Sequence, residues 1–285
     1  MTEVVTLGEL LIDFVPTVSG VSLTEAPAFK KAAGGAPANV AAGLAKLGVS
    51  AAFLGKVGDD AFGQFLKSTL DKVGVNTQGL VFSNEARTAL AFVSLRGDGE
   101  REFMFYRHPS ADMLYTPSEV DYELIKTAKI FHFGSISLIS EPSRSATLAA
   151  LDSARENGVL VSYDPNLRLA LWHDSALAKE GLLSVWERAD LIKISEDELT
   201  FLTGEEDIEQ AVEALWHDHL RLMVVTLGMS GCRYCTPNFM GMVPGFQVQA
   251  VDTTGAGDWF VAGLLIGLLQ YPQAWQHEAQ LKWVC

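Results

Sequence analysis

Short runs of apolar residues alternate along this chain with longer stretches of helical periodicity. The runs are apolar on both sides of an extended strand, which is typical of central strands in a parallel sheet. The predicted strands span residues 4–7, 52–57, 130–133, 160–163, 191–194 and 222–227, and the predicted helices span residues 37–47, 61–73, 143–156, 176–188 and 208–217. This alternation predicts a doubly wound α/β fold, in which helices cover both faces of a mostly parallel sheet.

Two segments depart from the alternation and predict a β-hairpin. Residues 88–95 and 101–107 show period-two patterning on either side of the turn-forming sequence Arg96-Gly97-Asp98-Gly99-Glu100. Residues 11–15, which precede Pro16, add another extended piece. Because an isolated hairpin is only marginally stable, we expect these segments to form a small sheet that projects from the main body.

The domain organisation follows from these two patterns. No internal repeat, low-complexity tract or long linker interrupts the chain. We expect one domain over residues 1–285, with a small β lid formed by about residues 11–30 and 88–108. This lid would cover the site or serve as the contact of a homodimer.

The composition is that of a globular protein with an acidic surface. Hydrophobic residues make up 48% of the 285 positions, charged residues make up 20%, and the formal net charge is −14. A charge of this sign repels nucleic-acid backbones and anionic lipid headgroups, so nucleic-acid and membrane partners are disfavoured. An anionic substrate would have to be met by local donors and a cation.

The cysteines and the chain's apolar segments indicate a reducing, cytoplasmic setting. Cys232, Cys235 and Cys285 are too few for a disulfide framework. We expect Cys232 and Cys235 on one strand, where residues three apart point to opposite faces, so a structural role is favoured over a redox or zinc site. The amino terminus lacks a basic stretch, and the longest apolar run, residues 259–269, is too short to cross a bilayer.

The strongest candidate for chemistry is Asp252-Thr253-Thr254-Gly255-Ala256-Gly257-Asp258, which precedes an apolar helical run. The glycines allow a tight turn, and the first amides of the following helix have no intrahelical partners, so they form a potential anion site. A carboxylate beside an anion site is useful if it takes a proton from a nucleophile that attacks a phosphate. The alternative is that Asp258 is an ordinary charge at a helix start.

A second glycine turn, Gly34-Gly35-Ala36-Pro37-Ala38-Asn39, opens the helix predicted at residues 37–47. The glycines permit close approach of the backbone to a ligand, and Asn39 presents an amide one turn inside the helix. Asp13 follows the first strand and can accept two hydrogen bonds from sugar hydroxyls. An ordinary helix start and a turn aspartate are the alternatives for these residues.

Together the two glycine turns resemble the two signatures of the ribokinase-like (PfkB) carbohydrate kinases. The sequences Gly8-Glu9-Leu10-Leu11-Ile12-Asp13-Phe14 and Asp164-Pro165-Asn166-Leu167-Arg168 are most similar to the fructokinase branch. The resemblance implies ATP-dependent phosphorylation of a primary hydroxyl of a sugar, with fructose as the first expectation. Alternatives are another small sugar, a sugar acid such as 2-keto-3-deoxygluconate, a nucleoside, or a catalytically silent relative that binds without turnover.

The resemblance also implies roles for individual residues. Asp258 matches the catalytic base, and the amides of Gly255, Ala256 and Gly257 match the anion hole. The sugar-binding positions are Asp13, Gly34, Gly35, Asn39, Phe105, Arg107 and Arg168; Phe105 and Arg107 are two apart and share one face of the lid strand. The ATP-binding positions are Ser195, Thr226, Gly228 and Gly231. Glu198 is retained for Mg²⁺, through a water molecule.

Three features depart from the family pattern. Ser195 stands where relatives usually have Asn, and Trp259 follows the catalytic aspartate where a small residue is usual. The sequence after Tyr271 does not resemble the family's closing segment, which covers the adenine side of the nucleotide pocket. The resemblance therefore leads us to expect a truncated carboxyl-terminal segment, weak ATP binding and weak or absent kinase activity.

Overall fold

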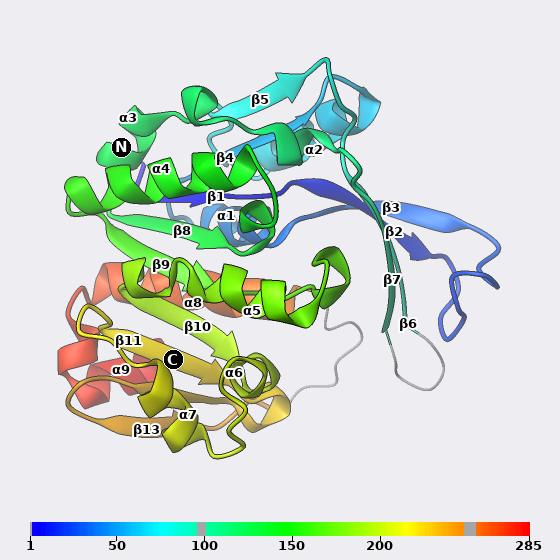
Figure 1. Cartoon of the computed structure of the whole chain (residues 1–285). Helices are drawn as coiled ribbons and strands as arrows, with labels where there is room; N and C mark the ends of the chain where they lie inside the picture. The colour runs from blue at the N-terminus through cyan, green and yellow to red at the C-terminus, as the bar shows by residue number, and fades with distance from the viewer. Residues whose placement is uncertain (1, 96–100, 248–254) are drawn as a thin grey trace.

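The computed structural model describes residues 2–95, 101–247 and 255–285. The large sheet is built from β1 (Val4–Leu7), β4 (Ala51–Gly58), β5 (Leu80–Ser83), β8 (Ile130–Gly134), β9 (Leu160–Asp164), β10 (Leu191–Ser195), β11 (Leu222–Thr226), β12 (Cys232–Cys235) and β13 (Met240–Val243). Among the described residues these nine strands lie in the order β13-β12-β11-β10-β9-β8-β1-β4-β5 (Figure 1). The strands from β11 to β5 are parallel, and β12 and β13 pair antiparallel at one edge.

Helices cover both faces of this sheet. They are α1 (Ala36–Lys46), α2 (Ala61–Lys72), α3 (Tyr122–Lys126), α4 (Ser143–Glu156), α5 (Ser175–Leu183), α6 (Glu196–Thr203), α7 (Ile208–Leu215), α8 (Ala256–Gln270) and α9 (Glu278–Val284). Short 3₁₀ turns are η1 (Ala111–Leu114), η2 (Pro117–Glu119), η3 (Ile136–Leu138), η4 (Leu169–Leu171), η5 (Trp186–Arg188), η6 (Gly228–Ser230) and η7 (Ala274–Gln276). One buried core contains residues of α4, α5, α6 and α7, and the other contains residues of α1, α2, α8 and α9. The predicted doubly wound α/β fold is confirmed.

A small second sheet projects beyond the carboxyl ends of the parallel strands (Figure 1). It contains β2 (Leu11–Pro16), β3 (Phe29–Gly34), β6 (Leu90–Leu95) and β7 (Arg101–Tyr106), in the order β3-β2-β6-β7. The expected hairpin strands pair antiparallel, with Leu90 opposite Tyr106. Its predicted turn, residues 96–100, lies outside the described residues. The sequence analysis did not identify β3, which extends this sheet to Gly34.

The predicted core elements agree closely with the observed ones, and two helices differ. The six predicted strands match β1, β4, β8, β9, β10 and β11 to within a residue at each end. The helix predicted at 176–188 is instead α5 followed by η5, because Trp186 turns into the core and its indole donates to the Leu215 carbonyl at 2.8 Å. The helix predicted at 208–217 ends at Leu215, since Trp216 is extended.

The cysteines have a structural environment. Cys232 and Cys235 lie on β12 and belong to the two different cores, on opposite faces of the sheet. Both side chains are buried and carry free thiols. The expectation of opposite faces for this CxxC is therefore confirmed. Separately, no helix within the described ranges is long and apolar enough to span a membrane.

Candidate active site

The carboxylate of Asp258 is held by amides from two distant segments. Asp258 lies in the first turn of α8 and is 6% exposed. Its Oδ2 accepts a hydrogen bond of 2.8 Å from Nδ2 of Asn39, in α1. Its Oδ1 accepts one of 3.3 Å from Nδ2 of Asn166, in the loop after β9. Both oxygens are thus oriented by neutral donors, which leave the carboxylate able to accept a proton.

The surroundings of Asp258 tune its basicity. Burial raises the pKa of its carboxyl to about 6, and the charge of Asp164 acts in the same direction. The Asn39 hydrogen bond and the cations of Arg168 and Lys193 oppose this rise in pKa. A carboxyl with this pKa is mostly ionised at pH 7 and is well matched to accept a proton there.

The glycine turn before α8 presents backbone amides beside this carboxylate. Gly255 is the N-cap of α8 with φ +75°, a left-handed conformation that favours glycine. The amides of Ala256 and Gly257 belong to the first turn, where helical donors lack intrahelical partners. Asp252, Thr253 and Thr254 of this motif lie outside the described residues. The described part of the turn has the backbone character expected of an anion site.

A buried lysine faces the same turn. The Nζ of Lys193, near the end of β10, donates to both carboxylate oxygens of Asp164, at 3.3 and 3.2 Å. A Cβ added at Gly257 would lie 3.2 Å from that Nζ. Burial alone would lower the pKa of Lys193, but the nearby carboxylates, Asp164 foremost, raise it above its usual value. Lys193 therefore places a positive charge next to the helix amides.

The first glycine turn packs tightly around Asp13 and Glu9. A Cβ at Gly34 would come within 2.1 Å of Oδ2 of Asp13, so only glycine fits beside this carboxylate. Gly35 has φ +110°, and a Cβ there would meet the carbonyl of Glu9 at 2.3 Å. The Glu9 side chain stabilises the turn, because its Oε1 accepts a hydrogen bond of 2.7 Å from the Ala36 amide. Burial raises the pKa of Asp13 to about 6, against the opposing charge of Arg168.

Aromatic side chains of the small sheet lie close to Arg168. The rings of Phe103 and Phe105 stack in parallel with centroids 5.9 Å apart, and the Arg168 guanidinium lies 5.9 Å from the Phe103 ring. Phe105 also packs against the buried Leu11 of β2. One face of β7 is therefore turned toward the loop that carries Arg168 and Asn166.

Arg107 has a position that the strand pattern did not anticipate. β7 ends at Tyr106, so Arg107 follows the lid strand and does not lie on it. Its guanidinium forms a buried ion pair with Asp112, in which Nε donates to Oδ2 at 3.1 Å. Arg107 is 4% exposed whereas Tyr106 is 57% exposed, which agrees with the expected opposite orientation of neighbouring residues. The partner of Arg107 in this structure is thus a carboxylate at the base of the lid.

The expected nucleotide-binding residues gather at the ends of β10 and β11. Ser195 and Thr226 end these strands and are paired in register. Gly228 begins η6 with φ +56°. Gly231 follows with φ +102°, and a Cβ there would meet the Val243 carbonyl at 2.0 Å. The turn can therefore carry no side chain at Gly231, because the backbone that follows β13 packs directly against it.

Glu198 joins two of the loops at this edge. Its Oε1 accepts from the Leu167 amide at 2.6 Å. Its Oε2 accepts from the amide and the hydroxyl of Ser195, each at 2.9 Å. Ser195 in turn caps α6, so its hydroxyl is engaged with Glu198. The carboxylate of Glu198 is paired only with neutral donors among the described residues.

Most of these residues were expected from the sequence near the carboxyl ends of the parallel strands, but three of them were not. Asp164, Asn166 and Lys193 received no role, although each lies at or next to the end of a predicted strand. Lys193 carried the clearest signal, because it is a charged residue inside an otherwise apolar buried strand. Asn166 has φ 43°, a left-handed conformation that its sequence alone does not reveal.

Trp259 lies between α1 and the glycine turn, because a Cβ at Gly255 would come within 3.9 Å of its indole. Its side chain is 42% exposed, and the Lys46 ammonium lies 5.3 Å from its ring. A Cβ at Gly43 would come within 3.3 Å of the indole. The indole therefore packs along α1, against Gly43 and Lys46.

Comparison with known proteins gives the family of this chain. The model of the pfkB family of carbohydrate kinases matches residues 1–280. A probable fructokinase-5 of Arabidopsis thaliana is 57% identical over 98% of this chain and 86% of its own length. Fructokinase-1 of Oryza sativa subsp. japonica is 58% identical over 98% of this chain and 87% of its own length.

Solved structures give the same result. A fructokinase of Vibrio cholerae O395 with fructose, ADP and calcium bound is 38% identical, with a TM-score of 0.86 over 100% of this chain and 89% of that one. A fructokinase of Xylella fastidiosa with bound ATP is 36% identical, with a TM-score of 0.86 over 95% of this chain and 82% of that one. The match along the sequence and the fold together place this chain in the pfkB family of carbohydrate kinases.

Proposed function

We propose that this chain transfers the γ-phosphoryl group of ATP to the primary hydroxyl of fructose, giving fructose 6-phosphate and ADP. The observation that carries the proposal is the buried Asp258 carboxylate, oriented by Asn39 and Asn166 in the first turn of α8. The fructokinase names of the similar proteins support fructose as the sugar.

Asp258 acts as the base in this scheme. The ionised carboxylate accepts the proton of the sugar hydroxyl while that oxygen forms a bond to the γ-phosphorus. The bond between the γ-phosphorus and its bridging oxygen breaks, and ADP leaves with that bond's electron pair. The amides of Asn39 and Asn166 hold the carboxylate in one orientation, which reduces the reorganisation needed at the moment of transfer.

Donors around Asp258 would meet the charge that develops on the transferred group. The first-turn amides of α8 point at this region, and Lys193 adds a cation beside Gly257. Arg168 approaches from the loop after β9, close enough to lower the pKa of both Asp13 and Asp258. Preorganised donors of this kind stabilise transition-state charge because they need not move during the reaction.

The sugar is proposed to lie between Asp13 and the inner face of the small sheet. Asp13 can accept hydrogen bonds from two hydroxyls, and the absence of a side chain at Gly34 lets its carboxylate lie against the backbone of the first glycine turn. Phe105 and Phe103 supply an apolar wall. Arg107 shapes this wall through its ion pair with Asp112, as a positioning residue.

The nucleotide is proposed to lie along Thr226, Gly228 and Gly231, with Mg²⁺ near Glu198. Magnesium usually keeps several waters and is held by one or two carboxylates together with substrate phosphates. Glu198 is such a carboxylate, and the described residues contain no cluster of three or more metal-binding side chains. This donor set fits an ion that arrives with ATP. When bound, magnesium would neutralise charge on the β- and γ-phosphates.

An assay of sugar-dependent ADP release tests the proposal. Fructose, glucose, ribose, 2-keto-3-deoxygluconate and adenosine are compared at equal concentration, with and without Mg²⁺. Fructose-dependent release supports the proposal, whereas preference for another acceptor assigns a different substrate. Binding of fructose without any ADP release would identify a silent relative. The same assay tests the expectation of weak turnover, since a rate of roughly one per second or more would contradict it.

The oligomeric state and the location complete the proposal. The outer face of the small sheet exposes Met104 and Tyr106, which could pair two copies into a homodimer through the lid. Light scattering of the purified chain measures this directly, and a monomer at all concentrations would exclude the dimer. A cytoplasmic location stays a prediction and rests on the three free thiols.

A further inference from the structure

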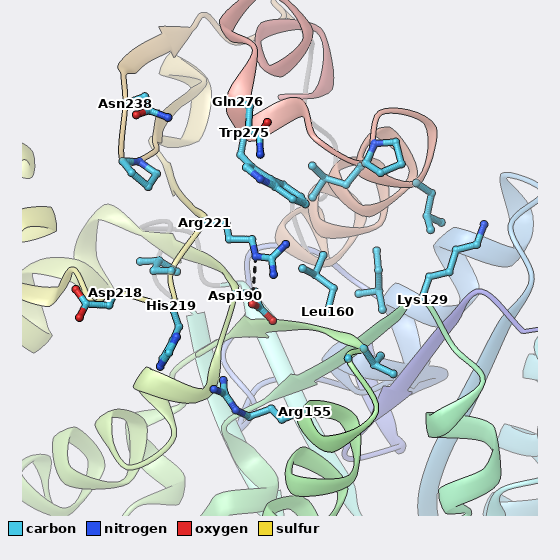
Figure 2. A pocket seen from close by; sticks show the side chains of 18 residues that line it. Lys129, Arg155, Leu160, Asp190, Asp218, His219, Arg221, Asn238, Trp275 and Gln276 are labelled. Atoms are coloured by element: carbon cyan, nitrogen blue, oxygen red, sulfur yellow. Dashed lines mark ion pairs between the residues drawn. The ribbon is translucent and has the colours of Figure 1, made fainter.

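A cavity lies at the amino-terminal ends of the parallel strands, at the opposite end of the large sheet from the candidate active site. Its volume is about 960 Å³, and it is formed at the amino-terminal ends of β8, β9, β10 and β11, with the end of α8 and η7 above them (Figure 2). Leu268 and Leu269 line the cavity from the last turns of α8, whereas Asp258 lies in the first turn of the same helix. A helix of 15 residues is about 22 Å long, so the two sites are separate.

The cavity gathers positive charge on a chain whose net charge is −14. Arg155 reaches it from the last turn of α4, and His219 and Arg221 reach it from the segment before β11. Figure 2 shows the Asp218 carboxylate pointing away from the two arginines. Lys129 lies at the rim, where its ammonium is paired with Glu3 at 2.8 Å. A local group of cations in a protein of net negative charge favours the binding of an anion at this place.

Of the two carboxylates that line the cavity, that of Asp190 is already engaged by protein donors. Oδ2 of Asp190 accepts from the Val161 amide at 2.9 Å. Its Oδ1 lies 3.4 Å from Nε of Arg221, as Figure 2 shows. The negative charge of Asp190 therefore orients Arg221 by its Nε edge and leaves the other edge of the guanidinium directed into the cavity.

Arg221 is also fixed from a second side. Its guanidinium lies 5.3 Å from the ring of Trp275, an indole that is 9% exposed. Within the described ranges, no acceptor is paired with the two terminal nitrogens of Arg221. Nη1 of Arg155 donates to the Arg188 carbonyl at 2.9 Å, which holds this side chain too while leaving its second terminal nitrogen without a described acceptor. Both arginines thus line the cavity, and each keeps a terminal nitrogen without a described acceptor.

We propose that this cavity binds a small organic phosphate. The phosphate would lie between Arg155 and Arg221, because planar guanidinium groups match phosphate oxygens in a bidentate manner. The carbon skeleton would lie on the apolar part of the wall, formed by Leu160, Leu268 and Trp275. The inference rests on this cavity alone and does not depend on the proposed kinase activity.

Isothermal titration of the full chain tests this site. Fructose 6-phosphate, AMP and inorganic phosphate are the probes, and fructose is the uncharged control. The titrations are repeated with Gly257→Val, in which the added side chain obstructs the anion turn of the active site. We expect one saturable site for at least one of the two organic phosphates. The organic phosphate that binds with the higher affinity identifies the ligand class as a sugar phosphate or a nucleotide.

Variants distinguish this cavity from other sites. Arg221→Gln and Arg155→Gln should each weaken binding roughly tenfold or more, because each removes charge-assisted hydrogen bonds. Arg144→Gln is the matched control, since Arg144 lies in the first turn of α4, at the other end from Arg155. Circular dichroism and thermal unfolding establish that each variant folds.

Four results would overturn the proposal. They are the absence of saturable binding for both organic phosphates, equal affinity in the wild type and both folded cavity variants, loss of binding in folded Gly257→Val, and inorganic phosphate binding as tightly as either ester.

Discussion

The side-chain amide of Asn39 donates a 2.8 Å hydrogen bond to Oδ2 of Asp258 across 219 positions of the sequence. The two glycine turns of the chain therefore meet at one carboxylate. The helices that follow these turns, α1 and α8, pack against each other on the same face of the sheet. This packing fixes the distance between the turn at Gly34 and Gly35, on the proposed sugar side, and the turn before α8, on the proposed phosphate side.

The first prediction concerns this hydrogen bond. Asn39→Ala removes a donor that lowers the pKa of Asp258, so that pKa should rise. The acid limb of the kcat/KM profile should shift to higher pH, and kcat/KM at its plateau should fall roughly 10- to 100-fold. Asn84→Ala, at an exposed position, is the control. An unshifted acid limb in Asn39→Ala would separate Asn39 from the titration of Asp258.

The second prediction concerns pH. Burial raises the pKa of both Asp258 and Asp13 to about 6. Since the base must be ionised, activity should be full above this value and fall as the pH drops through it. The kcat profile with saturating sugar isolates Asp258, while protonation of Asp13 should appear in the sugar KM. A kcat that stays flat down to pH 5 would contradict the assignment of Asp258 as the base.

The third prediction concerns the anion site. Gly257→Val places a branched side chain about 3.2 Å from Nζ of Lys193 and in front of the first-turn amides. Turnover should fall roughly 100-fold, the effect of losing a preorganised donor. Gly263→Val is the matched control, because it lies in the same helix and its Cβ meets nothing within 4 Å. Similar kinetics for the two variants would remove the glycine turn from the mechanism.

The fourth prediction concerns the base of the lid. Arg107→Ala should raise the sugar KM and leave the ATP KM nearly unchanged, because Arg107 shapes the sugar wall. The substitution also leaves Asp112 buried without its cation, at a cost of about 3–5 kcal/mol in stability. Arg107→Met combined with Asp112→Leu removes both charges and separates the two effects. A selective rise in the ATP KM in either variant would show that the lid base serves the nucleotide side.

The sequence predicted the scaffold well because the central strands are apolar on both faces and the helices between them are periodic. It also singled out Asp258 and Asn39 from the local signals of their glycine turns, and the structure joins the two side chains by a hydrogen bond. It could not give the partners of Arg107 and Glu198. Strand alternation gave Arg107 an orientation opposite to that of Tyr106, but its ion pair depends on where Asp112 lies after the chain has turned. Glu198 likewise accepts from Leu167, 31 positions away, and only the neighbouring positions of β9 and β10 bring them together.

Asn166 and Lys193 illustrate the same limit. Lys193 looks like an exception inside a buried strand until Asp164 is placed beside it by the pairing of the strand ends. Asn166 reaches Asp258 because its backbone is left-handed, and asparagine is one of the few residues that adopts this conformation readily. Contacts between segments far apart in sequence decide both roles.

The turnover of Asp258→Asn tests the central claim most directly. Asparagine keeps the size of the side chain and the helix start but cannot accept the proton. We expect kcat for fructose-dependent ADP release to fall by roughly 10² to 10⁴, while the binding constant for fructose changes little. Near-normal kcat in a folded Asp258→Asn protein would contradict the account, because asparagine cannot accept the proton and Asp258 would then not be the base.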